Sequence, residues 1–433
     1  MKTCRLLKIA GLLGLMIAPQ LNAYVQTSFF TPYDPDLRLP YPPKKTQWSF
    51  GAQFEYGDTK RGHDWDGKKV NILKMQNPTQ SSITMLDAAV TGVETAELAA
   101  IRNTLRIVGA VDDRIRGNID MTGSFEGFAA TPYVRWYVPG KLYGKFSLSA
   151  YLPIKHMSVR IKEWKDLTNK TKPTPVQDLE TVRLLTSSQE YLQNLITKFG
   201  SLKCDDWSST GIGDLVLMLD WHKIYRQKDS MLKKVCLHAK GGVSVPTGEE
   251  KDENEALSYA FGNDGAWSFP FGLGLDLTFK AKIKLGIEGQ LELILDNSKI
   301  RRMKTHLQQT ELFLLNKGKA SMDYGLTWKF YAYLQAFHCF KGFSIKAAYE
   351  YIKHDADKLK PESNEFSTVI VNTAKSLGEM HIHNIIASLN YDFFEECKDV
   401  CFKPQISLFY KIPVDARNIV SAQTFGGQLS FSF

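Results

Sequence analysis

Long hydrophobic runs are what this 433-residue sequence most clearly lacks. Beyond the N-terminus no stretch of about 18 apolar residues occurs, which excludes a conventional transmembrane helix. The mean hydropathy of −0.24 is that of a soluble protein, although membrane barrels reach similar averages because half of each strand is polar. Dense basic stripes with interleaved aromatics are also missing despite the net charge of +8, so nucleic acid is not expected as a partner.

Cysteine is scarce too, with 6 residues in the whole chain. Cys397 and Cys401 bracket a short polar segment and could form a disulfide across a tight turn, provided that the protein is exported to an oxidising compartment. The same spacing could suit a metal, but no second pair of ligands with a matching spacing exists. We therefore expect no metal at these cysteines and no cofactor.

The first 23 residues indicate that the protein is exported. They combine three basic residues, an apolar centre over residues 9–19 and a small-residue cleavage site that ends at Ala23. This pattern predicts a signal peptide. Residues 24–45 are rich in proline and tyrosine and have no clear period, so we expect a periplasmic N-terminal segment there. The main domain then covers residues 46–433.

The C-terminal segment alternates two kinds of side chain. From Phe425 to Phe433 every second residue is apolar, and the residues between them are polar or glycine. A period of two predicts a strand with one apolar face. A strand that ends the chain on an aromatic residue resembles the closing strand of bacterial outer-membrane β-barrels. The resemblance implies that Phe431 and Phe433 are read by the barrel-assembly machinery, whereas the alternative is an edge strand of a soluble sandwich.

Eleven further segments show the same alternation, most clearly residues 265–280. Pro132 is a flaw in this pattern, because proline is disfavoured in the middle of a soluble sheet. The strands predicted in this way are residues 46–58, 123–138, 144–158, 210–222, 233–246, 265–280, 283–297, 323–337, 343–354, 379–394, 402–412 and 423–433.

The connections between these strands alternate in length. Those after odd-numbered strands are long, and those after even-numbered strands are short. A soluble sandwich has no reason to sort its loops, whereas outer-membrane barrels have short periplasmic turns and long extracellular loops. We therefore predict an all-β fold, an antiparallel transmembrane β-barrel of about 12 strands. It would lie in the lipid of a bacterial outer membrane with both termini on the periplasmic side.

Two long insertions, 59–122 and 159–209, are expected on the extracellular side, each with a short helix. Residues 91–94 fit a capping box that opens a helix, and residues 187–190 fit a second one, whose helix would end at Gly200. The first insertion could instead fold into the lumen as a constriction. An outer loop is favoured, because loops usually stay at the surface.

Three short motifs resemble those of a known family. They are TGIGDL at residues 210–215, GVSVPTG at 242–248 and GAW at 265–267. They are similar to strand-end motifs of the outer-membrane proteins of the "meta-pathway of phenol degradation" type, distant relatives of the fatty-acid transporter barrels. The resemblance implies a transport barrel. Both insertions lie outside it, so an aromatic substrate does not follow.

The polar faces of the predicted strands would line the lumen, where we expect the functional residues. Both charge signs occur there, so strong ion selectivity is not predicted. The same side chains could instead pair with one another and fill a narrow barrel. The residues expected along the solute path are Arg135, Asp214, Lys240, Asp276, Glu288, Gln290, Glu292 and Lys329, with Tyr133 and Tyr331 as aromatic surface.

Catalytic constellations do not stand out. Asp220 and His222 share a face, but no serine can be assigned to them. His381 and His383 also share a face, yet no third ligand is identifiable and no metal is assigned. The sequence therefore predicts a channel for passive uptake of small solutes, with hydrophobic or aromatic solutes as candidates, and not an enzyme. The alternatives are a closed barrel whose surface loops bind a partner and a membrane enzyme acting on lipid.

Overall fold

A computed structural model describes residues 47–87, 117–139, 144–167, 189–228, 231–280, 282–340, 342–393 and 403–433. The predicted signal peptide, the segment 24–45, the helix opened at Thr91 and the Cys397–Cys401 pair lie outside these residues. Among the described residues, no helix is long and apolar enough to cross a membrane.

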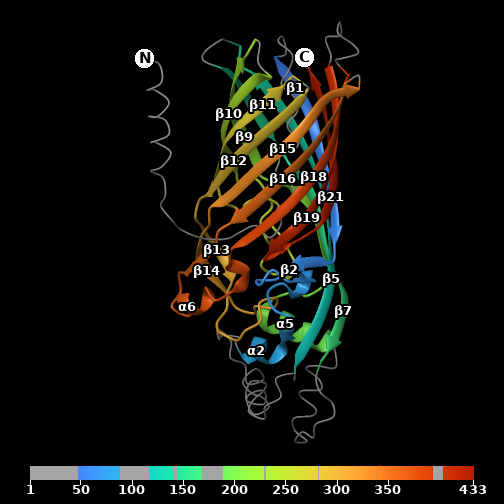
Figure 1. Ribbon diagram of the computed structural model, residues 1–433. Coiled ribbons are helices and arrows are strands. Elements are labelled where there is room, and N and C mark those ends of the chain that lie inside the picture. The colour runs from blue at the N-terminus through green and yellow to red at the C-terminus, as the bar shows by residue number, and fades with distance from the viewer. Residues whose placement is uncertain are drawn as a thin grey trace, which may run out of the picture.

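Twelve antiparallel strands form a closed barrel, as the sequence predicted (Figure 1). Closure is achieved by β1, which pairs with β5 on one side and with β21 on the other. A sheet in lipid cannot keep an unpaired edge, so closure satisfies the backbone and excludes the sandwich. The wall consists of β1 (Trp48–Thr59), β5 (Asn118–Tyr137), β6 (Lys145–Tyr151) continued by β7 (Ile154–Asp166), β8 (Trp207–Ile212) continued by β9 (Leu215–Arg226), β10 (Leu232–Val245), β11 (Ser268–Phe279), β12 (Ile283–Ile294), β15 (Thr327–Phe340), β16 (Phe343–His354), β18 (Met380–Asp392), β19 (Lys403–Arg417) and β21 (Gln423–Ser432).

The outer face of the wall is apolar. Phe271 and Leu273 on β11 are 51% and 57% exposed, whereas Asp276 on the inner face of the same strand is 1% exposed. Near the termini, the rings of Trp48 and Trp136 lie 6.2 Å apart, in the position of an interfacial aromatic girdle. A belt of this kind requires lipid around it, because it would otherwise be a very large exposed apolar patch.

The third and fourth wall strands are both interrupted, and the interruptions are adjacent. The Leu152 N–H donates to the Pro132 carbonyl at 3.1 Å, and the Gly213 N–H donates to the Pro153 carbonyl at 2.7 Å. The N–H and C=O of one residue in an antiparallel strand point to the same neighbour. Proline has no N–H group, and the missing N–H of Pro132 would have pointed at the interruption between β6 and β7. No regular ladder bond is lost there, which explains how β5 tolerates this proline.

The described parts of the long connections lie at the end of the barrel away from the C-terminus (Figure 1). They contain two small antiparallel sheets, an additional short strand, three α-helices and two 3-10 helices among the described residues. One sheet is β13 (Asn297–Arg302), β14 (Lys317–Asp323) and β17 (Lys358–Pro361), and the other is β20 (Ile419–Val420), β2 (Arg61–His63) and β3 (Lys69–Asn71). The remaining elements are η2 (Ile72–Lys74), β4 (Gln80–Ser81), α2 (Ser82–Asp87), α5 (Gln189–Gly200), α6 (Thr368–Val371) and η3 (Lys375–Leu377).

Helix α5 confirms the helix predicted to end at Gly200. The predicted boundaries of both insertions were wrong, however, because β5 begins at Asn118, β7 continues to Asp166 and β8 begins at Trp207. These strands project beyond the extracellular rim of the barrel. There the apolar side chains face inward and the polar ones face outward, the reverse of the barrel wall. Ile119 and Met121 face inward and are 1% exposed, and they belong to the main extracellular core. The prediction identified strands by their outward-facing apolar residues, so it ended each strand at the point where the apolar side chains turn inward.

Candidate functional site

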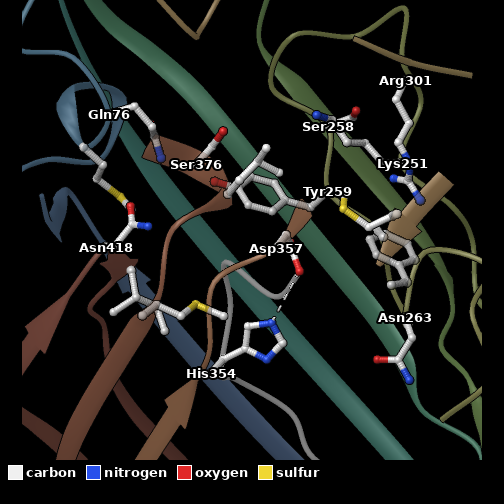
Figure 2. A pocket seen from close by; sticks show the side chains of 18 of the residues that line it. Gln76, Lys251, Ser258, Tyr259, Asn263, Arg301, His354, Asp357, Ser376 and Asn418 are labelled. Atoms are coloured by element: carbon white, nitrogen blue, oxygen red, sulfur yellow. Dashed lines mark ion pairs between the residues drawn. The ribbon is translucent and has the colours of Figure 1, made fainter. Parts of the chain in front are cut away.

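A cavity of about 320 Å³ lies between the extracellular insertions and the outer part of the lumen (Figure 2). The barrel wall contributes Val216, Glu292 and Lys329, whose side chains face inward. Leu257 and Tyr259, from the connection between β10 and β11, line the cavity from the insertions. Burial raises the pKa of Tyr259 to about 12, so this ring is neutral in ordinary buffers. The lining mixes apolar side chains with many polar and charged ones, among them Asp214, Glu292 and Lys329.

His354 and Asp357 form a buried polar pair on the wall of this cavity (Figure 2). Nε2 of His354 lies 3.9 Å from Oδ1 of Asp357, and its Nδ1 lies 2.6 Å from Oγ1 of Thr327. Neither carboxyl oxygen of Asp357 is hydrogen-bonded within the described part of the chain. Burial raises the pKa of Asp357 well above its usual range, which favours the neutral carboxyl, a form that can donate a hydrogen bond to a ligand.

Arg301 fixes the sheet that roofs the cavity. Its Nη1 donates to Oδ2 of Asp264 at 2.8 Å, and its Nη2 donates to the Tyr324 hydroxyl at 3.0 Å. Tyr324 and Asp264 are themselves buried. This arrangement joins β13 to the connection before β11, so the roof is attached to the wall by charge-assisted hydrogen bonds.

Three predicted lumen residues meet in a charged network inside β10, β11 and β12. Lys240 Nζ lies 2.9 Å from Glu288 Oε1, while Lys284 Nζ lies 2.8 Å from Asp276 Oδ2. His238 lies 3.6 Å from both carboxylates. The prediction missed Lys284 and His238, although their places on the polar faces of these strands could have revealed them. Gln290, also predicted, donates to Glu288 at 3.0 Å.

A second charged cluster, missed entirely by the prediction, lies on the strands β1, β16 and β19. Lys411 Nζ is 3.6 Å from Glu350 Oε2 and 4.0 Å from Glu55 Oε1. Asn384 donates to Glu350 at 2.8 Å, and Thr424 donates to Glu55 at 2.7 Å. Each of these residues faces the lumen from its own strand, but it is the pairing register of the strands around the barrel that brings them together.

The other predicted lumen residues are dispersed. Arg135 donates to the hydroxyls of Ser149 and Tyr151, both at 2.8 Å, and the Tyr133 hydroxyl accepts a 2.6 Å hydrogen bond from Gln428. Glu292 accepts from Ser268 at 2.6 Å.

Asp214 has a structural contact that the prediction did not foresee. It lies in the wall interruption and accepts the N–H groups of Gly248 and Asn263 at 3.0 and 2.6 Å. It thereby ties the connection between β10 and β11 to the wall.

The middle of the lumen is narrow. Tyr331 and Glu350 are both 0% exposed, and Glu288 is 3% exposed. Lys346 lies 5.8 Å from the centre of the Tyr331 ring. Side chains that lined a wide aqueous pore would be exposed to it, so these residues form a constriction below the extracellular cavity.

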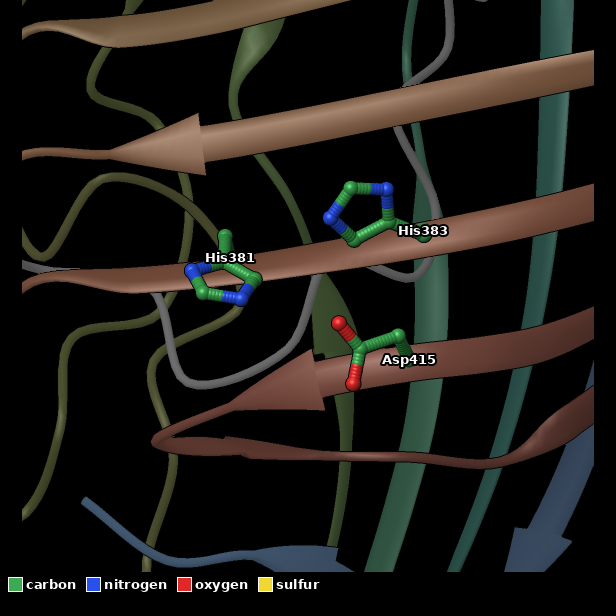
Figure 3. Close-up of side chains that lie close together, drawn as sticks. All are labelled: His381, His383 and Asp415. Atoms are coloured by element: carbon green, nitrogen blue, oxygen red, sulfur yellow. The ribbon is translucent and has the colours of Figure 1, made fainter. Parts of the chain in front are cut away.

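On the outer face, His381 and His383 of β18 lie beside Asp415 of β19 (Figure 3). A third potential ligand, which the sequence did not reveal, is thus on the neighbouring strand. Phe431 pairs with Phe50 of β1, and Phe433 is 50% exposed at the chain end. Recognition of these two aromatics by the assembly machinery stays a prediction.

No protein-family model matches the sequence, and no curated protein matches it. Among solved structures, the chain is similar to the COG4313 outer membrane channel from Pseudomonas putida F1. The TM-score is 0.50 at 10% sequence identity, covering 93% of this chain and 100% of that chain. This similarity shows the fold of a Gram-negative outer-membrane β-barrel, which agrees with the resemblance found in the sequence.

Two hydrocarbon transporters are similar at lower scores. The TodX deltaS2S3 mutant monoaromatic hydrocarbon channel has a TM-score of 0.35 at 10% identity, covering 90% of this chain and 91% of that chain. The toluene transporter TbuX from Ralstonia pickettii has a TM-score of 0.31 at 8% identity, covering 89% of each chain.

Proposed function

We propose that the protein is an outer-membrane channel for passive uptake of small solutes, with the extracellular cavity as its first solute-binding site. The observation that carries this proposal is the position of the cavity. Val216 and Lys329 belong to the lumen wall, yet they line the same cavity as Leu257 and Tyr259 of the insertions. A solute bound there is already between the outside and the lumen. The fold shared with an outer membrane channel supports the same function.

The lining of the cavity indicates the class of solute. Apolar side chains supply somewhat more of its surface than polar ones, and His354 and Asp357 are among its many polar groups. Such a mixed lining favours a small amphipathic solute, aromatic ones included, that carries a hydrogen-bond acceptor. The neutral Asp357 carboxyl would donate to that acceptor, and no covalent chemistry is assigned to the site.

The charged clusters below the cavity would control passage. Lys240 and Glu288 are paired, as are Lys411 and Glu350, so neither sign of charge dominates the constriction. We therefore expect weak ion selectivity, because strong selectivity requires a ring of one charge. Passage of a solute needs a temporary displacement of these side chains, with Tyr331 as the central obstacle.

A cavity-filling variant tests the proposal. Val216→Trp places a large ring in the cavity, so uptake of small aromatic alcohols into proteoliposomes should slow severalfold. Leu217→Trp is the matched control, because Leu217 is the next residue on β9 and faces lipid at 42% exposure. Equal uptake by both folded variants and the unmodified protein would exclude the cavity from the solute path.

A further inference from the structure

Three potential metal ligands converge on the outer face of the barrel, near its extracellular rim. His381 and His383 are separated by one residue on β18, so their rings project from the same face. Asp415 on β19 is the cross-strand partner of His383. One ligand atom from each of the three residues lies within 4.8 Å of the others, and Figure 3 shows the two rings and the carboxylate side by side.

A β-bulge is what brings Asp415 to this face. The pairing register shifts between His383 and Asn384, whose partners are Asp415 and Pro413. Val414 is therefore the extra residue, and it is 48% exposed. Regular alternation from Ile412 would point Asp415 into the lumen, but the bulge reverses its direction. Bulges often re-aim a side chain in this way beside functional sites.

Two of the three potential ligands are not committed to polar partners. Neither His381 nor Asp415 makes a hydrogen bond or ion pair with another residue that the structure describes, although the ring of His381 contacts that of His383. The neighbouring cations are already engaged: Arg417 donates to Glu379 at 2.8 Å, and Lys353 lies 3.5 Å from the same carboxylate. A cation arriving at the three ligands would therefore meet an uncompensated carboxylate.

His383 also has the support that metal-binding histidines commonly have. The Tyr349 hydroxyl lies 2.6 Å from its Nδ1, and the Tyr351 ring lies 4.6 Å from the imidazole. A polar partner on one ring nitrogen fixes the orientation of the ring and leaves the other nitrogen to coordinate. Nε2 of His383 would thus be the atom that coordinates a metal.

We propose that His381, His383 and Asp415 form a binding site for a divalent transition metal, with Zn²⁺ as the best match. Two imidazoles and one carboxylate, completed by water, are a familiar zinc ligand set. Bonds of about 2.0–2.1 Å place tetrahedral ligand atoms roughly 3.3 Å apart, so modest side-chain rotations bring these three ligands into range. The ion would link β18 to β19 across the bulge, next to the cavity that His381 also lines.

Calorimetric titration of the tag-free, full-length protein in detergent with ZnCl₂ tests the site. We expect one Zn²⁺ per chain. His383→Ala and Asp415→Asn should each weaken binding by at least about tenfold, and Tyr349→Phe by about tenfold through the lost outer partner. His156→Ala is the control, because His156 is a partly buried histidine on β7 that bonds Thr210 at 2.7 Å and should leave the affinity unchanged.

A second readout separates loss of ligands from loss of fold. Electron paramagnetic resonance of the Cu²⁺-loaded protein should show coupling to two imidazole nitrogens, and to one in the His383→Ala protein. Asp415→Asn keeps the size of the side chain, so its weakened binding cannot be attributed to unfolding. The proposal is overturned if a folded protein binds no Zn²⁺, or if binding survives in the His381→Ala/His383→Ala double variant.

Discussion

Glu350 illustrates how individual residues hold charge inside this barrel. Its side chain is 0% exposed, yet Asn384 donates to it and Lys411 lies 3.6 Å away. A buried pair of this kind contributes little net stability when intact, but removal of one member leaves the other charge buried. Removing such a residue therefore destabilises the protein mainly because the charge of its partner stays buried without compensation.

Replacing Glu350 should consequently destabilise the barrel. In the Glu350→Ala variant one of the two carboxylates facing Lys411 is lost, and we expect the free energy of unfolding to fall by about 3 kcal/mol. Urea titration in detergent micelles measures it. Glu126→Ala is the control, because its contact with Arg160 is 4.0 Å long and both side chains are at least 43% exposed; it should change stability by about 0.5 kcal/mol or less. Similar losses in both variants would contradict the buried-pair account.

Asp357 makes stability depend on pH. Burial raises its pKa well above the usual range, while the unfolded carboxyl titrates near about 3.9. The folded state therefore keeps a proton that the unfolded chain releases. The contribution of the neutral carboxyl is fully present below about pH 3.9 and is lost as the pH rises toward the folded pKa.

The Asp357→Asn variant removes this titration. Its Tm should rise relative to that of the unmodified protein as the pH increases from about 4 to about 8, because asparagine does not ionise. Scanning calorimetry at each pH measures the difference. A constant difference across this range would show that Asp357 is not a buried neutral acid.

At the scale of elements, the strands were predictable and their partnerships were not. A period of two in one strand is local information, so all twelve wall strands could be found. The meeting of Lys411 with Glu350 and Glu55 depends on register around a closed sheet, which no single strand encodes. Asp415 escaped prediction for a related reason, since the bulge at Val414 breaks the alternation that assigns faces.

Phe125, where β5 pairs with the last residue of β1, gives a prediction about the extracellular region. Phe125 is 1% exposed and its ring centre lies 5.9 Å from that of Tyr259. Phe125→Ala should cost about 3–5 kcal/mol and loosen the extracellular core while the barrel wall stays folded. Limited proteolysis should then cleave the insertions faster, with little change for Phe128→Ala, a lipid-facing control on the same strand at 40% exposure. Equal cleavage of both variants would mean that Phe125 does not anchor this region.

At the scale of the whole molecule, three layers follow one another along the barrel. The extracellular insertions form a roof, the cavity lies beneath it, and the constriction around Tyr331 lies deeper in the lumen. The apolar belt fixes this stack in lipid, and the paired charges keep the interior polar without a dominant sign. In the proposed channel, these layers would leave a narrow path whose permeability a few side chains set.

Single-channel conductance in a planar bilayer is the most direct test of this channel. The full-length protein should give small, steady conductance with weak ion selectivity, and small aromatic alcohols should reduce it. Tyr331→Ala should increase the conductance, because the ring at the constriction is removed. A correctly folded barrel that conducts neither as the unmodified protein nor as Tyr331→Ala would contradict the channel and favour a closed barrel whose extracellular loops bind a partner.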